Sequence, residues 1–172
     1  MADNADIRGM IRDLALKRDS IDRRQLYFAL VQAEVWFPVS AKSAAGHVTP
    51  GDLQPLDREA LGGLAAFAFF THLDAAEGWQ KEEAGSEQLR LEHMAFVDLL
   101  PLLLDAGAGS AFINPAAKFT GELYRHELQT ILDGARRLAA RTPSTPSVGS
   151  AEPSESAESS PPRSWWQRLL GR

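Results

Sequence analysis

The residues with the clearest potential for chemistry stand together in the run Thr71, His72, Leu73 and Asp74. A hydroxyl, an imidazole and a carboxylate are the three groups of a nucleophile, a base and the acid that orients the base. At spacings of one and two residues on a single helix start, however, these side chains do not converge as a triad normally does. The same residues fit a capping box, in which Thr71 accepts from the backbone of Asp74 and the Asp74 carboxylate accepts from the amide of Thr71. We therefore interpret the run as a helix start.

Other motifs for catalysis or ligand binding are weak. The four histidines, at positions 47, 72, 93 and 126, never stand three or four residues apart, so no helix face carries two metal ligands. DAGAGS, residues 105–110, lacks the lysine of a phosphate loop and follows a helix instead of preceding one. The absence of cysteine excludes thiolate catalysis, disulfides and Cys-ligated metals. The sequence predicts no metal and no cofactor, and it favours a protein without catalytic activity.

A second candidate site is the pair Asn114-Pro115, at the end of an expected buried strand. A residue before proline avoids helical geometry, and Asn readily bonds the backbone of a turn, so the structural interpretation is a strand terminator. The alternative is that Asn114 lines a crevice at the carboxyl ends of strands, where open α/β sheets bind ligands. Thr71 and Trp79 would then complete a crevice for a small ligand or a substrate.

The charge of the chain excludes one class of partner. The 172 residues carry a formal net charge of −5, and residues 143–172 hold as many acids as bases, so the acidity lies in the body. Nucleic acid is therefore not an expected partner, because binding it requires clustered Lys and Arg. The apolar run at 99–104 is far shorter than the ~20 residues that span a bilayer. The opening MADNADIRGM lacks the features of a secretory signal. We expect a cytoplasmic protein.

Two helices and a strand are expected in the first forty residues. Apolar residues recur at spacings of three and four in 3–19 and in 22–33, which predicts amphipathic helices. In EVWFPVS, residues 34–40, apolar residues alternate, which predicts a strand with Trp36 on the face opposite Val35 and Phe37. We expect a helix to cover Trp36. The alternative is that Trp36 is exposed, in which case it would mark a surface for a partner. Pro38 cannot donate a ladder bond and predicts an edge strand or a strand end.

The centre of the expected sheet is LAAFAFF, residues 64–70, whose continuous apolar character is typical of a strand covered on both faces. A short strand near 53–56 precedes it, with a turn at Gly62 and Gly63. The sequence then predicts a helix over 71–79, a strand over 89–97 and a helix capped by Asp98 with Pro101 in its first turn. After these we expect a strand over 110–114, an extended segment at 121–125 and a helix over 126–140. Alternating strands and helices predict parallel crossovers. The fold class is α/β (α+β), one mixed-sheet domain with flanking helices over 1–142.

The last thirty residues differ in composition. Residues 143–163 hold seven Ser and five Pro and predict a disordered linker, because they cannot bury enough apolar surface to offset chain ordering. SWWQRLLGR, residues 164–172, predicts a short amphipathic helix that forms on contact. Its contact residues are Trp165, Trp166, Arg168, Leu169 and Leu170. The expected acceptor is a hydrophobic groove on a partner protein; the alternatives are an anionic membrane surface, and the protein's own body or another copy.

Three stretches together resemble the N-terminal domain of the SseB family, named for enhanced serine sensitivity. They are ALVQAEVWFPV, AFAFFTHLDAAEGW and VDLLPLLLDAGAGSAFINP, within roughly residues 20–140. The resemblance implies a mixed α/β domain with no established catalytic activity. In two respects the chain departs from the family pattern: Ala116 stands where a glycine commonly follows the Asn-Pro pair, and a linker with a Trp-rich end replaces the second domain of longer members. We expect an interaction module with a docking tail; the rival is a ligand-binding protein or enzyme.

Overall fold

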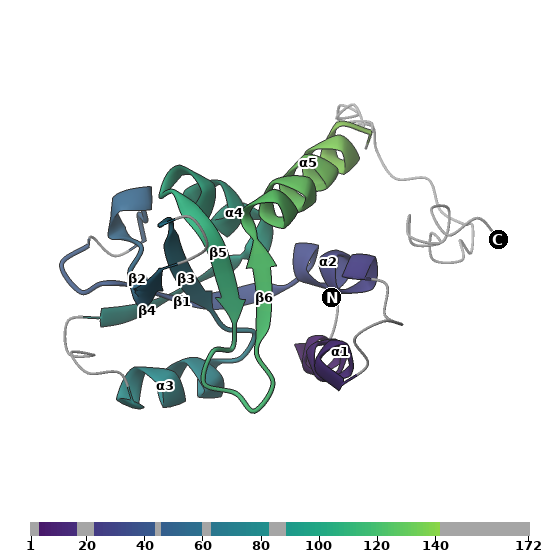
Figure 1. Cartoon of the computed structure of the whole chain (residues 1–172). Coiled ribbons are helices and arrows are strands. Elements are labelled where there is room, and N and C mark those ends of the chain that lie inside the picture. Colours follow the sequence, from purple (N-terminus) through teal and green to yellow (C-terminus); the bar gives the residue numbers. More distant parts are fainter. Residues whose placement is uncertain (1–3, 17–22, 44–45, 60–62, 83–88, 142–172) are drawn as a thin grey trace, which may run out of the picture. The chain divides into compact units, whose positions relative to one another are not determined.

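The computed structural model describes residues 4–16, 23–43, 46–59, 63–82 and 89–141, all of them within one compact unit, Met1–Thr142 (Figure 1). The predicted linker and C-terminal motif lie outside these residues, as does Gly62 of the predicted turn. The elements in chain order are α1 (Asn4–Leu16), α2 (Arg23–Val31), β1 (Glu34–Ser40), a 3-10 turn η1 (Pro50–Asp52), β2 (Pro55–Glu59), β3 (Ala65–Phe69), α3 (Leu73–Glu82), β4 (Leu89–Ala95), α4 (Phe96–Asp105), β5 (Ala108–Ile113), β6 (Gly121–Tyr124) and α5 (Arg125–Arg141).

The strands form a mixed arrangement of two hydrogen-bonded sheets. In the larger sheet, of order β2-β3-β5-β6, β3 is antiparallel to β2 and parallel to β5, and β6 is antiparallel to β5. β1 pairs with β4 antiparallel over seven residues, and bridges from Trp36 to Phe70 and from Val39 to Leu53 join β1 to the larger sheet. The mixed α/β fold is thus confirmed.

The predicted parallel crossover is correct for β3 and β5 and wrong for β4. Strands buried on both faces read as continuous apolar runs, as β3 does. β4 instead carries Arg90, Glu92 and His93, and most of its residues are only half-buried. That composition suits an antiparallel strand beside β1 with one face open, which is where β4 lies.

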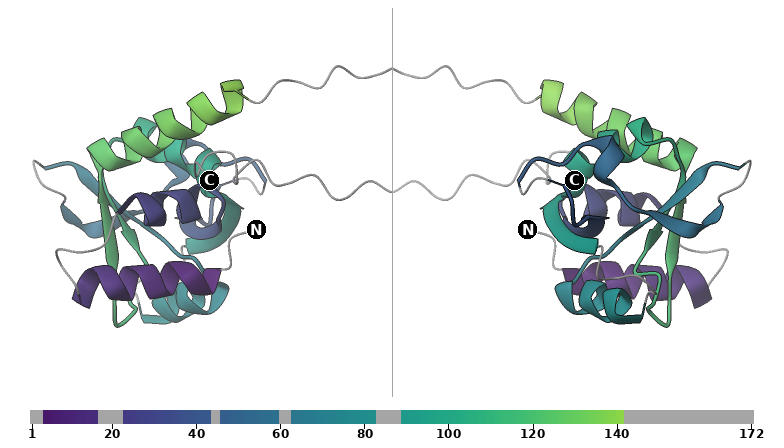
Figure 2. Two further views of the ribbon diagram at one scale, coloured as in Figure 1. Left: turned by 90° about the vertical axis from the view of Figure 1, so that its right-hand side faces the viewer. Right: turned by 90° about the vertical axis from the view of Figure 1, so that its left-hand side faces the viewer.

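β3 divides the core into two clusters because its side chains alternate between the sheet faces. Phe67 and Phe69 pack into the larger cluster with apolar residues of α1, α2, α4 and α5. Ala66, Ala68 and Phe70 point the other way, into a smaller cluster that α3 covers with Trp79. In both views of Figure 2, α2 lies between α1 and α5. The four helices over Phe67 and Phe69 thus form one layer, in which α2 is packed from two sides.

The helices follow the predicted stripes, with one corrected boundary. Ile7 and Ile11 of α1 are buried, as predicted. α4 begins at Phe96, after the N-cap residue Ala95, so Asp98 lies in the first turn and does not cap the helix. Because Phe96 is fully buried, its packing extends the helix two residues before Asp98. Pro101 is therefore interior to α4, where its ring removes one backbone hydrogen bond.

β1 continues through Pro38, so the strand does not end there; β1 is instead an edge strand, the other alternative predicted, because it forms a two-stranded sheet with β4. The amide and carbonyl of Trp36 exchange hydrogen bonds with Phe70, at 2.8 and 2.7 Å, and the carbonyl of Pro38 accepts from the amide of Gln54. The nitrogen of Pro38 therefore points away from β4, so the ladder between β1 and β4 loses no donor. Trp36 is half-buried in the smaller cluster, its ring 4.4 Å from that of His93.

Candidate functional site

The structure joins Thr71 and Asn114 in a polar cluster at the carboxyl ends of β3 and β5. Asn114 Oδ1 accepts from the amide of Thr71 at 3.0 Å, and Asn114 Nδ2 donates to Thr71 Oγ1 at 3.1 Å. His72 Nδ1 lies 2.7 Å from Thr71 Oγ1 and accepts from Arg8 Nε of α1 at 3.1 Å. Arg8 also binds Asp74. We call these five residues the strand-end network.

The directions of these hydrogen bonds determine what the network can do chemically. Guanidinium and amide nitrogens only donate, so Nδ1 of His72 is an acceptor and the ring carries its proton on Nε2. Because Nδ1 is an acceptor, Thr71 Oγ1 donates its own proton to His72, and it accepts from Asn114. The lone pair that would make His72 a base at Nδ1 is already used. Thr71 is fully buried and Asn114 is 2% exposed, so a substrate cannot reach the hydroxyl.

Asn114 has the geometry of a strand terminator. Its φ of 52° is left-handed, a region that Asn tolerates better than most residues. Its own amide donates to the carbonyl of Phe69, and its carbonyl accepts from the amide of Ala117. Each polar group of Asn114 is thus bonded within the domain, which supports the structural interpretation of this residue.

Asp74 does not complete the predicted capping box. Its two carboxylate oxygens accept from Arg8 Nη2 at 3.1 and 3.2 Å, and the amide of Thr71 donates to Asn114 instead. The hydrogen bond from Arg8 is the main reason why the pKa of Asp74 lies below its usual range. The first helical residue of α3 is Leu73, and the carbonyl of His72 accepts from the amide of Ala76. Asp74 therefore fastens α1 to the start of α3.

Trp79 does not open a crevice beside Thr71 and Asn114. It is 5% exposed, and its ring packs 5.4 Å from that of Phe70 in the smaller core cluster. Phe70 is itself fully buried. The three residues of the predicted crevice are thus all buried, two in mutual hydrogen bonds and one in apolar packing.

Neither a candidate metal cluster nor a membrane-spanning helix is present in the described part of the chain. It contains no cluster of three or more His, Cys, Asp or Glu that could hold a metal ion. Within the same residues, every helix is too short or too polar to cross a bilayer.

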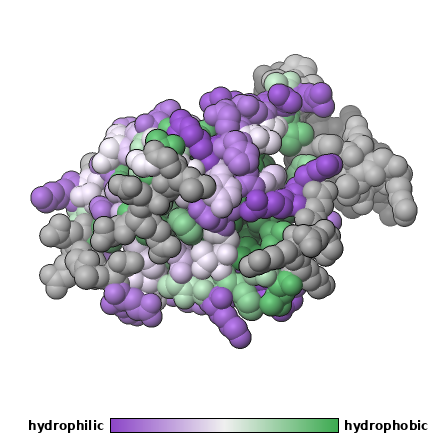
Figure 3. All heavy atoms as spheres, viewed as in Figure 1, coloured by the Kyte–Doolittle hydropathy of each residue, from purple (hydrophilic) through white to green (hydrophobic). Residues whose placement is uncertain are grey.

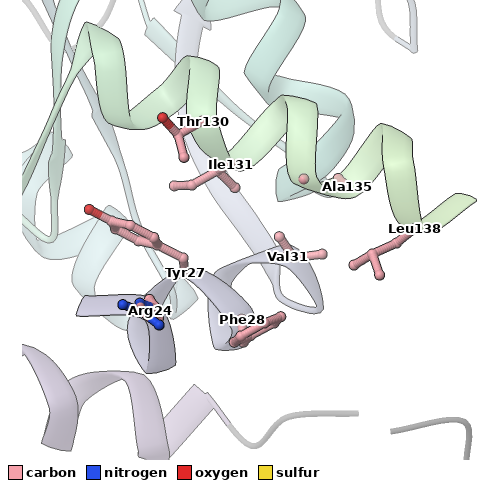
Figure 4. Close-up of a pocket in the computed structure, with 9 residues that line it drawn as sticks. Arg24, Tyr27, Phe28, Val31, Thr130, Ile131, Ala135 and Leu138 are labelled. Atoms are coloured by element: carbon pink, nitrogen blue, oxygen red, sulfur yellow. The ribbon is translucent and has the colours of Figure 1, made fainter. Parts of the chain in front are cut away.

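A surface feature that the sequence analysis did not predict lies between α2 and α5. We call it the α2/α5 groove. It is a hollow of about 160 Å³, almost wholly apolar. Figure 4 shows the two helices facing one another across it. Figure 3 shows a separate gathering of hydrophobic atoms at the lower right of the molecule, where α1 lies. The lining residues are Arg24, Tyr27, Phe28, Val31, Thr130, Ile131, Gly134, Ala135 and Leu138.

The two hydroxyl groups that line the groove are bonded inside the domain. The hydroxyl of Thr130 donates to the carbonyl of His126, one turn earlier, at 2.7 Å. The hydroxyl of Tyr27 donates to Glu127. Burial, followed by the hydrogen bond with Glu127, raises the pKa of Tyr27 to about 12. The groove therefore offers apolar contact and few polar groups.

A buried carboxylate holds one end of the groove together. Glu127 is 5% exposed, pairs with Arg23 of α2 at 2.8 Å and accepts from the amide of Tyr124 at 2.9 Å. The bond to Tyr124 is the half of a capping box in which an N3 glutamate reaches back to the N-cap amide. Glu127 thus stabilises the start of α5 and anchors α2 to it. Its position three residues after Tyr124 was the available sequence signal.

The fold and these two features define a small mixed α/β domain with a closed polar network at its strand ends and an open apolar groove between two helices. A family model described as the SseB protein N-terminal domain matches residues 7–130. The match covers well over half of the chain, which therefore belongs to the SseB family, as its resemblance indicated. A search among curated proteins found no match.

Proposed function

We propose that this chain is a non-enzymatic, cytoplasmic interaction module that binds a protein partner through the α2/α5 groove. The observation that carries the proposal is the exposure of Phe28, 44% exposed on a helix whose other large apolar residues are covered. Phe28 lines the groove with Val31 and Leu138. Large aromatic residues dominate interface energetics, and an apolar groove between helices is a common peptide-binding surface.

The strand-end network supports the same proposal because it is unsuited to catalysis and to ligand binding. Catalysis needs a reactive group that a substrate can reach, and binding a small ligand needs polar groups that converge in a cavity. Thr71 and Asn114 are buried and bonded to each other. A ligand at this position would have to break that pair, so the groove is the better candidate for contact with another molecule.

The C-terminal motif, residues 164–172, provides a second contact in this proposal. Trp165, Trp166, Leu169 and Leu170 form two i, i+4 pairs on a helix. Nine residues are too few for a stable helix in water, so we propose that the motif folds on its acceptor. A weak second contact raises the overall affinity of a tethered protein through effective concentration. An anionic membrane is the alternative acceptor, and a blue shift of tryptophan fluorescence on adding anionic vesicles would select it.

The groove can be tested by a substitution that fills it with a large side chain, compared with the same substitution elsewhere in the domain. A Cβ atom added at Gly134 meets no heavy atom within 4 Å, and the same holds for Gly78 of α3. Gly134→Phe therefore fills the groove without a clash at its Cβ, and Gly78→Phe makes the same change outside it. We expect in-cell crosslinking followed by affinity capture to lose partners with Gly134→Phe and to keep them with Gly78→Phe. Identical recovery from both variants, with a melting temperature that responds to a metabolite panel, would contradict the proposal.

A further inference from the structure

We infer that the α2/α5 groove selects an amphipathic helix of another protein whose polar flank carries carboxylates. The inference rests on the proposed function, because it names the chemistry of the partner at the same groove. Its two supports are the shape of the lining and the sign of the charge around it.

The lining has the spacing of a helix-binding surface. On α2 the lining positions are 24, 27, 28 and 31, and on α5 they are 130, 131, 134, 135 and 138. Spacings of three and four place each set along one face of its helix over about two turns, roughly 10 Å. Side chains of a third helix can pack into the groove between two such rows. Gly134 deepens the middle of the groove because it has no side chain.

The flanks of the groove are basic although the chain as a whole is acidic. α2 and the last eight residues of α5 contain five arginines, but Arg23 is paired with Glu127 and Arg136 lies on the far side of α5. Arg24 lines the groove. Arg137 and Arg141 are exposed and follow Gly134 and Leu138 by three residues each, which places them on the same side of α5.

Of the two carboxylates of α5 near the groove, Glu127 is paired with Arg23, whereas Asp133 keeps its charge because its partner Gln129 is neutral. Glu127 is bonded to Tyr27 and Arg23, and Asp133 accepts from Gln129 Nε2 at 3.0 Å. The acidic residues of α1 lie on the other side of α2, since α2 separates α1 from α5 (Figure 2). On the described part of α5, Arg137 and Arg141 thus outnumber the one carboxylate beside the groove that has no ion-pair partner, and charge complementarity favours a partner with Glu or Asp beside its apolar stripe.

Two other occupants fit less well. The chain's own motif, residues 164–172, contains Arg168 and Arg172 and no acidic side chain. Its positive charge would therefore be repelled by the arginines beside the groove. A second copy that presents the same groove would oppose arginine to arginine. A small polar ligand would find the lining hydroxyls of Tyr27 and Thr130 already bonded within the domain.

The experiment uses the full chain and three labelled peptides. Two are helical, of about 14 residues, long enough to hold some helix in water. They share one leucine stripe and differ only in carrying Glu or Lys on the polar face; the third is SWWQRLLGR. We expect the acidic peptide to bind at least about tenfold more tightly than the basic one at low salt, with a smaller difference at ~0.5 M salt, because screening shortens the reach of surface charges. Gly134→Phe should abolish the binding and Gly78→Phe should not.

Charge reversal provides the decisive variant. Arg137→Glu with Arg141→Glu should invert the preference between the acidic and basic peptides. Arg136→Glu is the matched control, because Arg136 is exposed and lies two residues from both Gly134 and Leu138, on the far side of α5. The reversed residues are all exposed, so the fold should tolerate them.

The outcomes separate this inference from the proposed function. Equal binding of both designed peptides, released by Gly134→Phe, would overturn the charge selection and leave the groove as an interaction surface. Tightest binding of SWWQRLLGR, or self-association that Gly134→Phe abolishes, would overturn the choice of occupant. If no peptide responds to Gly134→Phe, the inference falls together with the proposed function.

Discussion

The strand-end network and the α2/α5 groove are opposite in the chemistry they present and in their access. The network gathers a hydroxyl, an imidazole, an amide and an ion pair, and its central residues, Thr71 and Asn114, are buried. The groove has almost no polar lining, yet Phe28 is open to solvent. Residues with catalytic potential therefore hold the fold together here, while residues without it form the surface suited to contact.

The strand-end network and the α2/α5 groove should respond differently to substitution. Changes in the network should reduce the free energy of unfolding and leave partner binding to the folded protein unchanged. Changes that fill the groove or reverse its charge should reduce partner binding and should not reduce the free energy of unfolding. The expected effects on stability decrease from Asn114 to the Arg8–Asp74 pair.

The largest loss is expected for Asn114→Ala. The substitution leaves the buried amide of Thr71 without its acceptor, which costs about 1–3 kcal/mol, and it forces Ala into left-handed geometry at about 1 kcal/mol more. A total of about 2–4 kcal/mol would lower Tm by roughly 10 °C in a domain of this size. Asn114→Gly removes the hydrogen bonds without the backbone strain, so it should cost less than Asn114→Ala. Thermal unfolding of both variants tests this. A wild-type Tm with lost partner binding would show that Asn114 is functional.

A smaller loss is expected for Thr71→Val, which keeps the shape of the side chain and removes its hydroxyl. Asn114 Nδ2 then loses its acceptor inside the core, at a cost of about 1–3 kcal/mol. Thr71→Ser, which retains the hydroxyl, should be nearly neutral. Denaturant unfolding of the two variants measures the difference. If Thr71→Val left the unfolding midpoint unchanged while activity in cells disappeared, the network would have to be reinterpreted as a functional site.

Sequence patterns predicted the parts of this fold that depend on neighbouring residues. The alternation in β1, the apolar run of β3 and the stripe of α1 each depend on local spacing, and each is present as predicted. The start of α4 was predicted three residues late, because the burial of Phe96 is a tertiary effect that outweighs the capping preference of Asp98. Local preference is a weaker signal than packing at such a boundary.

The candidate sites were harder to predict because both depend on long-range contacts. Thr71 and Asn114 were singled out correctly as residues at strand ends, but only the parallel pairing of β3 with β5 places them within one hydrogen bond of each other. The groove joins residues about a hundred positions apart, such as Val31 and Ile131. Gly134, inside a helix where glycine is disfavoured, was the local signal for it.

Gly134→Ala should stabilise the protein, the opposite sign to the two network substitutions. Glycine in a helix interior is less favourable than Ala by about 0.8–1.0 kcal/mol, and the added Cβ meets nothing within 4 Å. An increase in Tm of roughly 3 °C is expected for that gain. Gly78→Ala in α3 is the control, and it should show a similar gain. A loss of stability in Gly134→Ala alone would mean that the groove closes in solution around the missing side chain.

The smallest effect is expected at the ion pair between Arg8 and Asp74, at the exposed edge of the network. The side chains are 47% and 75% exposed, so solvent screening limits their coupling to about 0.5 kcal/mol or less. Arg8 lowers the pKa of Asp74, so Asp74 is ionised more readily in the folded state than in the unfolded one. The stability from this pair is therefore fully present above the ordinary Asp pKa of ~3.9 and is lost as the pH falls through the lower folded value. A double-mutant cycle of Arg8→Ala and Asp74→Ala measures the coupling at pH 7 and again below pH ~3. High salt should weaken the coupling at pH 7, and Arg8→Lys should retain part of it because the charge is kept. A coupling of several kcal/mol that survives high salt would show that this edge is as closed as Thr71 and Asn114, and the contrast with the groove would then extend to the surface of the domain.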